Sequence, residues 1–163
     1  MPQQCRMFLW LVSWDKLLTN ANREKRGLTN NLICPLCEME YETTDHVLRS
    51  CPEAATVWQW FHSTGMGKFD SQLPFNEWAK LNILGKDLMK VVTTMWYIWK
   101  WRTLVCFNGV DTIPNDKPKF LLGQFHEILD ALAMEDLRGG KKRKVPSVCG
   151  LGTPRRRMDS VEY

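Results

Sequence analysis

The chain has 163 residues, 44% of them hydrophobic, and a formal net charge of +4. This length allows one domain with a tail or two small lobes, and the composition is sufficient for a hydrophobic core. The apolar run at residues 7–14 is too short to span a bilayer and lacks a signal cleavage site, and the apolar run at 88–107 contains three basic residues. We therefore expect neither a membrane segment nor a secretory signal.

The positive charge is concentrated at one end of the sequence. Residues 1–61 carry six Lys/Arg and seven Asp/Glu, and residues 62–137 carry eight and nine, so each part is close to neutral. Residues 138–163 carry eight Lys/Arg and two Asp/Glu. The folded body is therefore not predicted to be a strongly basic nucleic-acid-binding surface.

The first elements expected along the chain are two helices. Residues 5–18 have apolar side chains at helical spacing, with Asp15 and Lys16 outside the apolar face. Thr19 is a candidate N-cap for a second, short helix, and Gly27 is a candidate left-handed residue at its end.

The most informative pattern follows: Cys34, Cys37, His46 and Cys51 have the spacing C-x2-C-x8-H-x4-C. Three thiolates and one imidazole in this spacing predict a tetrahedral zinc site, and such a closed set leaves no position for a reactive water. The alternative is that the cysteines are small buried hydrophobes and the histidine is an ordinary core residue.

The other three cysteines are isolated in the sequence and are interpreted as core or tail thiols. Of these, Cys5 and Cys149 are weaker candidates for a substitute ligand. Free thiolates and zinc are more compatible with a reducing intracellular compartment than with disulfides.

Between and after the ligands, the sequence predicts short structures around the metal. Residues 39–42 could form a two-stranded excursion, and Thr44 is a candidate cap for a helical turn at residues 45–50. Pro52 is suited to the first turn of a helix that extends to about Phe61.

The second half is predicted to be helical. Residues 63–75 contain glycines and a proline and are interpreted as a linker, and residues 86–107 and 117–136 are predicted as long helices joined by a turn at 111–116. The predicted fold class is therefore mainly α: a small zinc-stabilised helical domain with a disordered basic C-terminal tail. We divide it into a zinc-binding lobe (residues 1–62), a helical lobe (63–137) and the tail (138–163).

Around the ligands, the chain resembles the zinc-binding domain that follows the reverse transcriptase in plant non-LTR retrotransposons. The similarity covers about residues 5–108 and ends with a Trp-x-x-Trp-Lys helix. The residues that carry it are Cys5-Arg-Met-Phe-Leu-Trp10, Leu17-Leu-Thr19, Arg26-Gly27-Leu28, Cys34-Pro-Leu-Cys37, Glu42, Asp45-His46, Cys51-Pro52, Val57-Trp58, Met95-Trp-Tyr-Ile-Trp-Lys100, Arg102 and Phe107.

The resemblance implies zinc on Cys34, Cys37, His46 and Cys51 and a role in engaging a nucleic-acid strand beside a polymerase. One departure is Thr103, where the family usually has Asn. We expect a truncated form, without the polymerase and without the ribonuclease H domain, so those activities are not inferred.

Candidate nucleic-acid contacts lie close to the ligands in sequence. The basic residues among them are Arg23, Lys25, Arg26 and Arg49. Trp58 and Trp60 could stack on unpaired bases, although Trp58 falls on the apolar face of its helix and is expected in the core. Against nucleic-acid binding, four acidic residues make the segment between the ligands negative: Glu38, Glu40, Glu42 and Asp45.

The tail contains two basic clusters that predict nuclear targeting. An alternative is a solvated end without a partner. The residues are Lys141, Lys142, Arg143, Lys144, Arg155, Arg156 and Arg157.

Taken together, the sequence predicts a non-enzymatic, nuclear, zinc-binding module without a small-molecule substrate. We find no nucleophile–base set, phosphate-binding loop or dinucleotide-binding pattern. The first hypothesis is binding to RNA or DNA, and the alternative is a zinc-stabilised adaptor for a nuclear protein partner. A third possibility is an inert, decayed fragment.

Overall fold

The computed structural model describes residues 3–66, 72–109 and 113–139. The described chain is mainly helical, as predicted, and its only strand-like pairing is an isolated bridge between Ile33 and Tyr41. The helices are α1 (Gln3–Ser13), α2 (Asn20–Glu24), η1 (His46–Ser50), α3 (Pro52–Ser63), α4 (Phe75–Ile83), α5 (Leu88–Asn108) and α6 (Lys117–Gly139).

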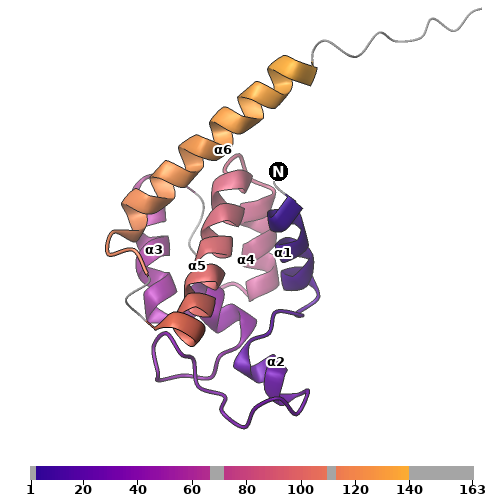
Figure 1. Cartoon of the computed structure of the whole chain (residues 1–163), viewed down its shortest axis with the longest axis vertical. Helices are drawn as coiled ribbons and strands as arrows, with labels where there is room; N and C mark the ends of the chain where they lie inside the picture. Colours follow the sequence, from indigo (N-terminus) through magenta and orange to yellow (C-terminus); the bar gives the residue numbers. More distant parts are fainter. Residues whose placement is uncertain (1–2, 67–71, 110–112, 140–163) are drawn as a thin grey trace, which may run out of the picture.

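Helix α5 lies at the centre of the fold. It packs on α1 and α4 on one side and on α6 on the other, and its C-terminal half faces η1 and the loops that carry the predicted metal ligands (Figure 1). The metal-ligand loops and α2 lie together at one end of the molecule (Figure 1).

Helix α1 ends earlier than its apolar pattern predicts. Asp15 has a left-handed backbone (φ 48°), which an L-residue adopts at a cost, and this ends the helix at Ser13 instead of residue 18. The Asn22 side-chain amide donates to the carbonyls of Asp15 (2.9 Å) and Leu17 (3.0 Å), so the tight turn is hydrogen-bonded from α2.

The start of α2 confirms the prediction from Thr19. The Thr19 hydroxyl accepts a hydrogen bond from the Asn22 amide (3.3 Å), which satisfies one of the free N–H groups at the helix start. Gly27 has a φ of 67°, a conformation that glycine adopts without steric cost, and it ends this segment as predicted.

Pro52 occupies the first turn of α3, as predicted, but α4 was not expected from the sequence. Trp78, Ala79 and Asn82 form the buried face of α4, at the helical spacing i, i+1 and i+4. The predicted linker at residues 63–75 is therefore shorter and ends at Pro74, directly before α4. Part of that linker, residues 67–71, lies outside the described residues.

The predicted long helices are present as α5 and α6. Helix α5 begins and ends within two residues of its prediction, and the predicted turn before α6 ends at Asp116, whose carboxylate accepts from the Lys119 amide (2.9 Å). Residues 110–112 of that turn and residues 140–163 of the predicted tail lie outside the described residues.

One hydrophobic cluster takes side chains from both sides of residue 62. The Trp58 ring meets Trp78 edge-on, with centroids 5.1 Å apart, and Phe61 meets Phe125 in the same way at 6.2 Å. The buried Trp58 indole N–H donates to the Leu48 carbonyl (2.7 Å), so the core tryptophan is also satisfied as a donor. The division at residue 62 remains a prediction, and it does not separate two cores.

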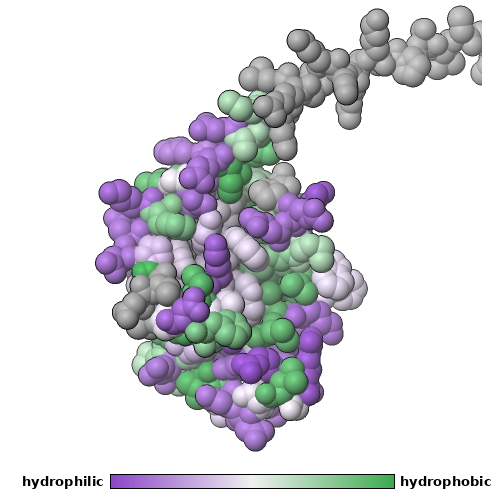
Figure 2. All heavy atoms as spheres, in the orientation of Figure 1, coloured by the Kyte–Doolittle hydropathy of each residue, from purple (hydrophilic) through white to green (hydrophobic). Residues whose placement is uncertain are grey.

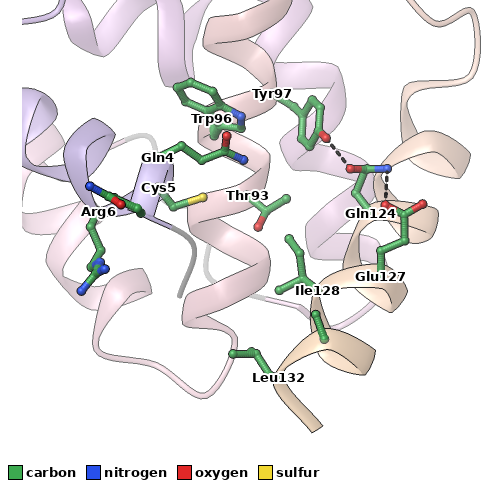
Figure 3. Close-up of a pocket in the computed structure, with 12 residues that line it drawn as sticks. Gln4, Cys5, Arg6, Thr93, Trp96, Tyr97, Gln124, Glu127, Ile128 and Leu132 are labelled. Carbon is green, nitrogen blue, oxygen red and sulfur yellow. Dashed lines mark hydrogen bonds between the residues drawn. The ribbon is translucent and has the colours of Figure 1, made fainter. Parts of the chain in front are cut away.

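A hollow of about 560 Å³ lies between the start of α1, the first half of α5 and α6 (Figure 3). Trp96, Tyr97 and Ile128 form part of its wall, and the Tyr97 hydroxyl donates to the Gln124 side chain. Thr93 also lines the hollow, and its hydroxyl is buried without a hydrogen-bond partner among the described residues. Among the described helices, none has the length and apolar character needed to cross a bilayer.

Candidate metal centre

The structure brings the four predicted ligands together. One donor atom from each of Cys34, Cys37, His46 and Cys51 lies within 4.8 Å of all the others. Cys34, His46 and Cys51 are buried, and Cys37 is half-buried. The first two ligands come from the loop after α2, His46 begins η1, and Cys51 directly precedes α3.

The loop between the first two ligands is a tight, hydrogen-bonded turn. The Cys34 carbonyl accepts from the Glu38 amide (2.8 Å), and the Cys34 amide donates to the Glu40 carbonyl (2.8 Å). Glu38 has a left-handed backbone (φ 55°), which turns the chain back after Cys37. The predicted two-stranded excursion is therefore reduced to the single bridge from Ile33 to Tyr41.

The other two ligands are brought together by a wide helical turn. The Cys51 amide donates to the His46 carbonyl (2.7 Å), a five-residue step that defines a π-helical turn. The residue that caps this turn is Thr43, whose hydroxyl accepts from the His46 amide (3.0 Å). The prediction of Thr44 as the cap was wrong, because the Thr44 hydroxyl donates to Asp15 (2.6 Å).

The His46 imidazole is oriented by contacts on both ring nitrogens. Its Nε2 lies 3.3 Å from the Cys37 Sγ, toward the cluster, and its Nδ1 lies 3.1 Å from a carboxylate oxygen of Glu40. The distance to Glu40 suits a hydrogen bond, but the alignment does not, and the buried Nδ1 has no well-aligned partner. A carboxylate beside the second nitrogen of a metal-binding histidine favours the tautomer that leaves Nε2 free for the metal.

The thiols of Cys34 and Cys51 shift each other's pKa in opposite directions. A hydrogen bond from the Cys51 thiol lowers the pKa of Cys34 to about 5, against the opposing effect of burial. The same hydrogen bond and burial raise the pKa of Cys51 above its ordinary value. The cluster therefore holds one thiolate readily, and a cation is needed to hold several in one buried site.

The donor set fits zinc. Tetrahedral zinc with Zn–S bonds of about 2.3 Å separates its sulfurs by roughly 3.8 Å, so donors within 4.8 Å of one another need only small shifts. Four protein ligands complete the tetrahedron, and the chemistry that zinc supplies in such a site is structural. Among the described residues, Cys5 and Cys106 lie outside the cluster, and Cys149 is not described.

A buried ion pair that the sequence analysis missed supports the ligand loop. The Glu42 carboxylate is fully buried and accepts from the Arg102 guanidinium at 2.5 and 2.6 Å and from the Asn20 amide at 2.6 Å. In the sequence, Glu42 was counted in the acidic segment between the ligands, and both Glu42 and Arg102 belong to the family resemblance, but they were not predicted to pair. Their charges, 60 residues apart, could not be paired from spacing.

Arg49 is not available for the predicted phosphate contact. Its guanidinium binds both carboxylate oxygens of Asp45 (2.7 and 2.8 Å) and the Leu73 carbonyl (2.7 Å), and it lies over the rings of Phe75 and Trp78. The side chain is buried. We correct its assignment from a nucleic-acid contact to a structural residue that connects η1 to α4.

The other predicted cations lie on and after α2. Arg23 is half-buried and donates to the Asn20 side chain (3.2 Å), Lys25 is exposed and donates to the Asn22 side chain (3.1 Å), and Arg26 is exposed. Trp58 is buried, as expected, and Trp60 is half-buried against Phe61. The predicted nuclear-targeting residues all lie outside the described residues.

The fold and site together define a helical domain organised around a zinc-binding cluster of three cysteines and one histidine. Comparison with known proteins adds that residues 1–58 match a family described as zinc-binding in reverse transcriptase. This match includes all four ligands and confirms the resemblance predicted from the sequence.

An Arabidopsis thaliana protein named "Putative ribonuclease H protein" is 27% identical to this chain over 164 residues. The alignment covers 94% of this chain and 26% of the relative, so the chain spans about a quarter of that relative's length. No solved structure matches the chain.

Proposed function

We propose that this chain is a non-catalytic, zinc-stabilised module that binds nucleic acid. The observation that carries the proposal is the placement of Arg23, Lys25 and Arg26 beside the metal loop: the Asn20 amide at the start of α2 binds Glu42 of that loop (2.6 Å). A cluster of this kind can contact phosphates while the metal fixes the backbone that presents it.

Similarity supports the same proposal. The matching family is described by its occurrence in reverse transcriptase, and the relative is named for ribonuclease H, and both enzymes act on nucleic acid. The non-catalytic assignment is supported by the four protein ligands, which leave zinc no position for a substrate or a reactive water.

A salt titration tests the proposal. The zinc-loaded chain is titrated into labelled single-stranded and duplex oligonucleotides at increasing salt, with binding measured by fluorescence anisotropy. We expect affinity to fall steeply with salt, and we expect Arg26→Gln to reduce the slope of log affinity against log salt by about one. A zinc-loaded protein without affinity for any oligonucleotide would refute the proposal.

A second candidate function, a protein-interaction adaptor, is favoured by the tip of the metal loop. Met39 and Tyr41 are 67% and 64% exposed there, next to the exposed acidic residues Glu38 and Glu40. The acidic surface is smaller than the sequence predicts, because Glu42 and Asp45 are paired with arginines. Capture of a protein that survives nuclease treatment and is lost in Tyr41→Ser would favour the adaptor.

We also propose that the chain is directed to the nucleus by the basic residues of its tail. Two clusters, residues 141–144 and 155–157, are of the kind that acidic import receptors recognise. A fluorescent reporter fused to residues 138–163 should accumulate in nuclei, and an even distribution through the cell would refute this.

A further inference from the structure

An open groove of about 500 Å³ lies beside α2, at the junction of α1 and α5. Its walls include the indoles of Trp10 and Trp99 and the side chain of Leu18, and Lys16 and Arg26 are at its rim. In Figure 2, hydrophobic side chains gather on the surface over the lower end of α1, with hydrophilic side chains next to them. The sequence pattern suggested Trp58 and Trp60 as stacking residues, and Trp10 and Trp99 were not among them.

Both indoles are presented on rigid elements. Trp10 lies in α1 with 54% of its surface exposed, an unusually high fraction for a tryptophan. Trp99 lies in α5, and the buried Arg102 guanidinium sits 5.1 Å from its ring centroid. Because Arg102 is itself fixed by Glu42, the orientation of the Trp99 ring is set before any ligand binds.

The charge of the groove is positive. Lys16 and Arg26 line it, and the described residues that line it include no carboxylate. Neither of these two side chains has a hydrogen bond or an ion pair with another described residue. The nearby Asp15 carboxylate is paired with the Lys25 ammonium (3.9 Å), which partly offsets its charge.

We propose that this groove binds the unpaired bases of single-stranded nucleic acid, with bases stacked on Trp10 and Trp99 and phosphates held by Lys16 and Arg26. Aromatic platforms with flanking cations are the general means by which proteins bind single strands, and duplex bases are stacked on one another and cannot reach an indole. This inference rests on the proposed function and adds to it the strand form and the contact surface.

Tryptophan variants test the groove. Affinities of the zinc-loaded full chain for a fluorescein-labelled 12-mer of thymidine and for a duplex of the same length are compared for the wild type, Trp10→Ala and Trp14→Ala. Trp14 is a matched control, because it is 63% exposed on the same segment but does not line the groove. Arg26→Gln and Arg6→Gln are compared in the same way. Arg26 lines the groove, and Arg6 is its control because it lies at the hollow between α1 and α6.

We expect the wild type to prefer the single strand, Trp10→Ala to lose about tenfold in affinity, and Trp14→Ala to be unchanged. Equal affinities of Trp10→Ala and the wild type would overturn the groove assignment and leave the proposed function intact, whereas a wild type that binds neither oligonucleotide would refute both. Sedimentation of the wild type as a dimer that Trp10→Ala dissociates would assign the groove to a second copy of the chain and overturn the inference.

Discussion

Arg102 and Glu42 form a bidentate, buried ion pair that connects the central helix α5 to the loop that carries the metal ligands. The exposed fractions of the two side chains are 6% and 0%. Burial acts to lower the pKa of Arg102, but the hydrogen bonds and charge of Glu42 outweigh it and raise that pKa above its ordinary value. Arg102 therefore stays protonated at every physiological pH, and the role of the pair is to fix the loop against α5.

Removal of one partner of this pair should be strongly destabilising. Arg102→Met leaves the Glu42 carboxylate buried without its cation, and we expect the free energy of unfolding to fall by about 3–5 kcal/mol. Adding Glu42→Gln to this variant should recover part of the loss. Urea unfolding of zinc-loaded protein completes this double-mutant cycle, and strictly additive effects would show that the two residues are not coupled.

Loss of one metal ligand should affect the whole domain. We expect Cys34→Ser to abolish stoichiometric zinc binding, measured by mass spectrometry, and to lower the melting temperature of all helices followed by circular dichroism, because structural zinc contributes folding free energy. The control is Cys106→Ser, an exposed cysteine outside the cluster. Retention of one zinc per chain in Cys34→Ser would contradict the assignment of the ligands.

The contact between Glu40 and His46 gives a finer test of the site. Glu40→Gln removes the charge 3.1 Å from the His46 Nδ1, and we expect zinc affinity to fall by about tenfold. Competition with a chromogenic chelator measures the change. Glu38→Gln alters an exposed carboxylate in the same loop and should leave the affinity unchanged. If both variants lost zinc affinity equally, the loss would be due to the general charge of the loop and not to the contact between Glu40 and His46.

The opposite pKa shifts of Cys34 and Cys51 predict how zinc affinity depends on pH. Because the pKa of Cys34 is lowered to about 5, this ligand has already lost its proton above pH 5 and contributes to the pH dependence only as the pH falls through that value. Cys51, whose pKa is raised, keeps a proton that zinc must displace. With Cys34 excluded, at most two of the three thiols can release a proton when zinc binds. Between pH 7 and 8.5, the log of the zinc affinity should therefore rise by at most about two per pH unit. A slope of three would show that Cys34 is protonated in the metal-free chain.

Arg49 should matter for stability and not for binding. Arg49→Lys keeps the charge but cannot reproduce the planar contacts to Asp45, Leu73 and the ring of Trp78, and we expect a loss of about 2 kcal/mol in unfolding free energy. Its affinity for oligonucleotides should stay within about twofold of the wild type. Arg26→Lys, at an exposed position, should leave stability unchanged. A loss of oligonucleotide affinity in Arg49→Lys that Arg26→Lys does not show would restore the assignment of Arg49 as a nucleic-acid contact.

The metal site could be predicted from the sequence because all four ligands lie within one short segment. Cys34 to Cys51 form one short segment, and the chemistry of the ligands restricts which residue types can occupy it. The Thr19 cap and the Pro52 helix start were predictable for the same reason, since each depends on neighbouring backbone groups.

The predictions were wrong or incomplete where the structure of a residue depends on contacts with segments distant in the sequence. Position close to the ligands suggested that Arg49 was a surface cation, but Phe75 and Trp78 of α4 cover it. Helix α4 itself was missed because it is nine residues long and follows a segment rich in glycine and proline. Helical spacing gives a weak signal over so short a length, and this helix depends on packing of Trp78 against Trp58.

The shared core around Trp58 has a consequence for how such modules are inherited. The family match ends at residue 58, inside α3, but the rings that enclose Trp58 and Phe61 belong to Trp78 and Phe125. The segment that the family match covers is therefore smaller than the segment that folds. A protein that acquired residues 1–58 alone would acquire the metal ligands without their hydrophobic cover, and it would need helices from its new host to take the places of α4, α5 and α6.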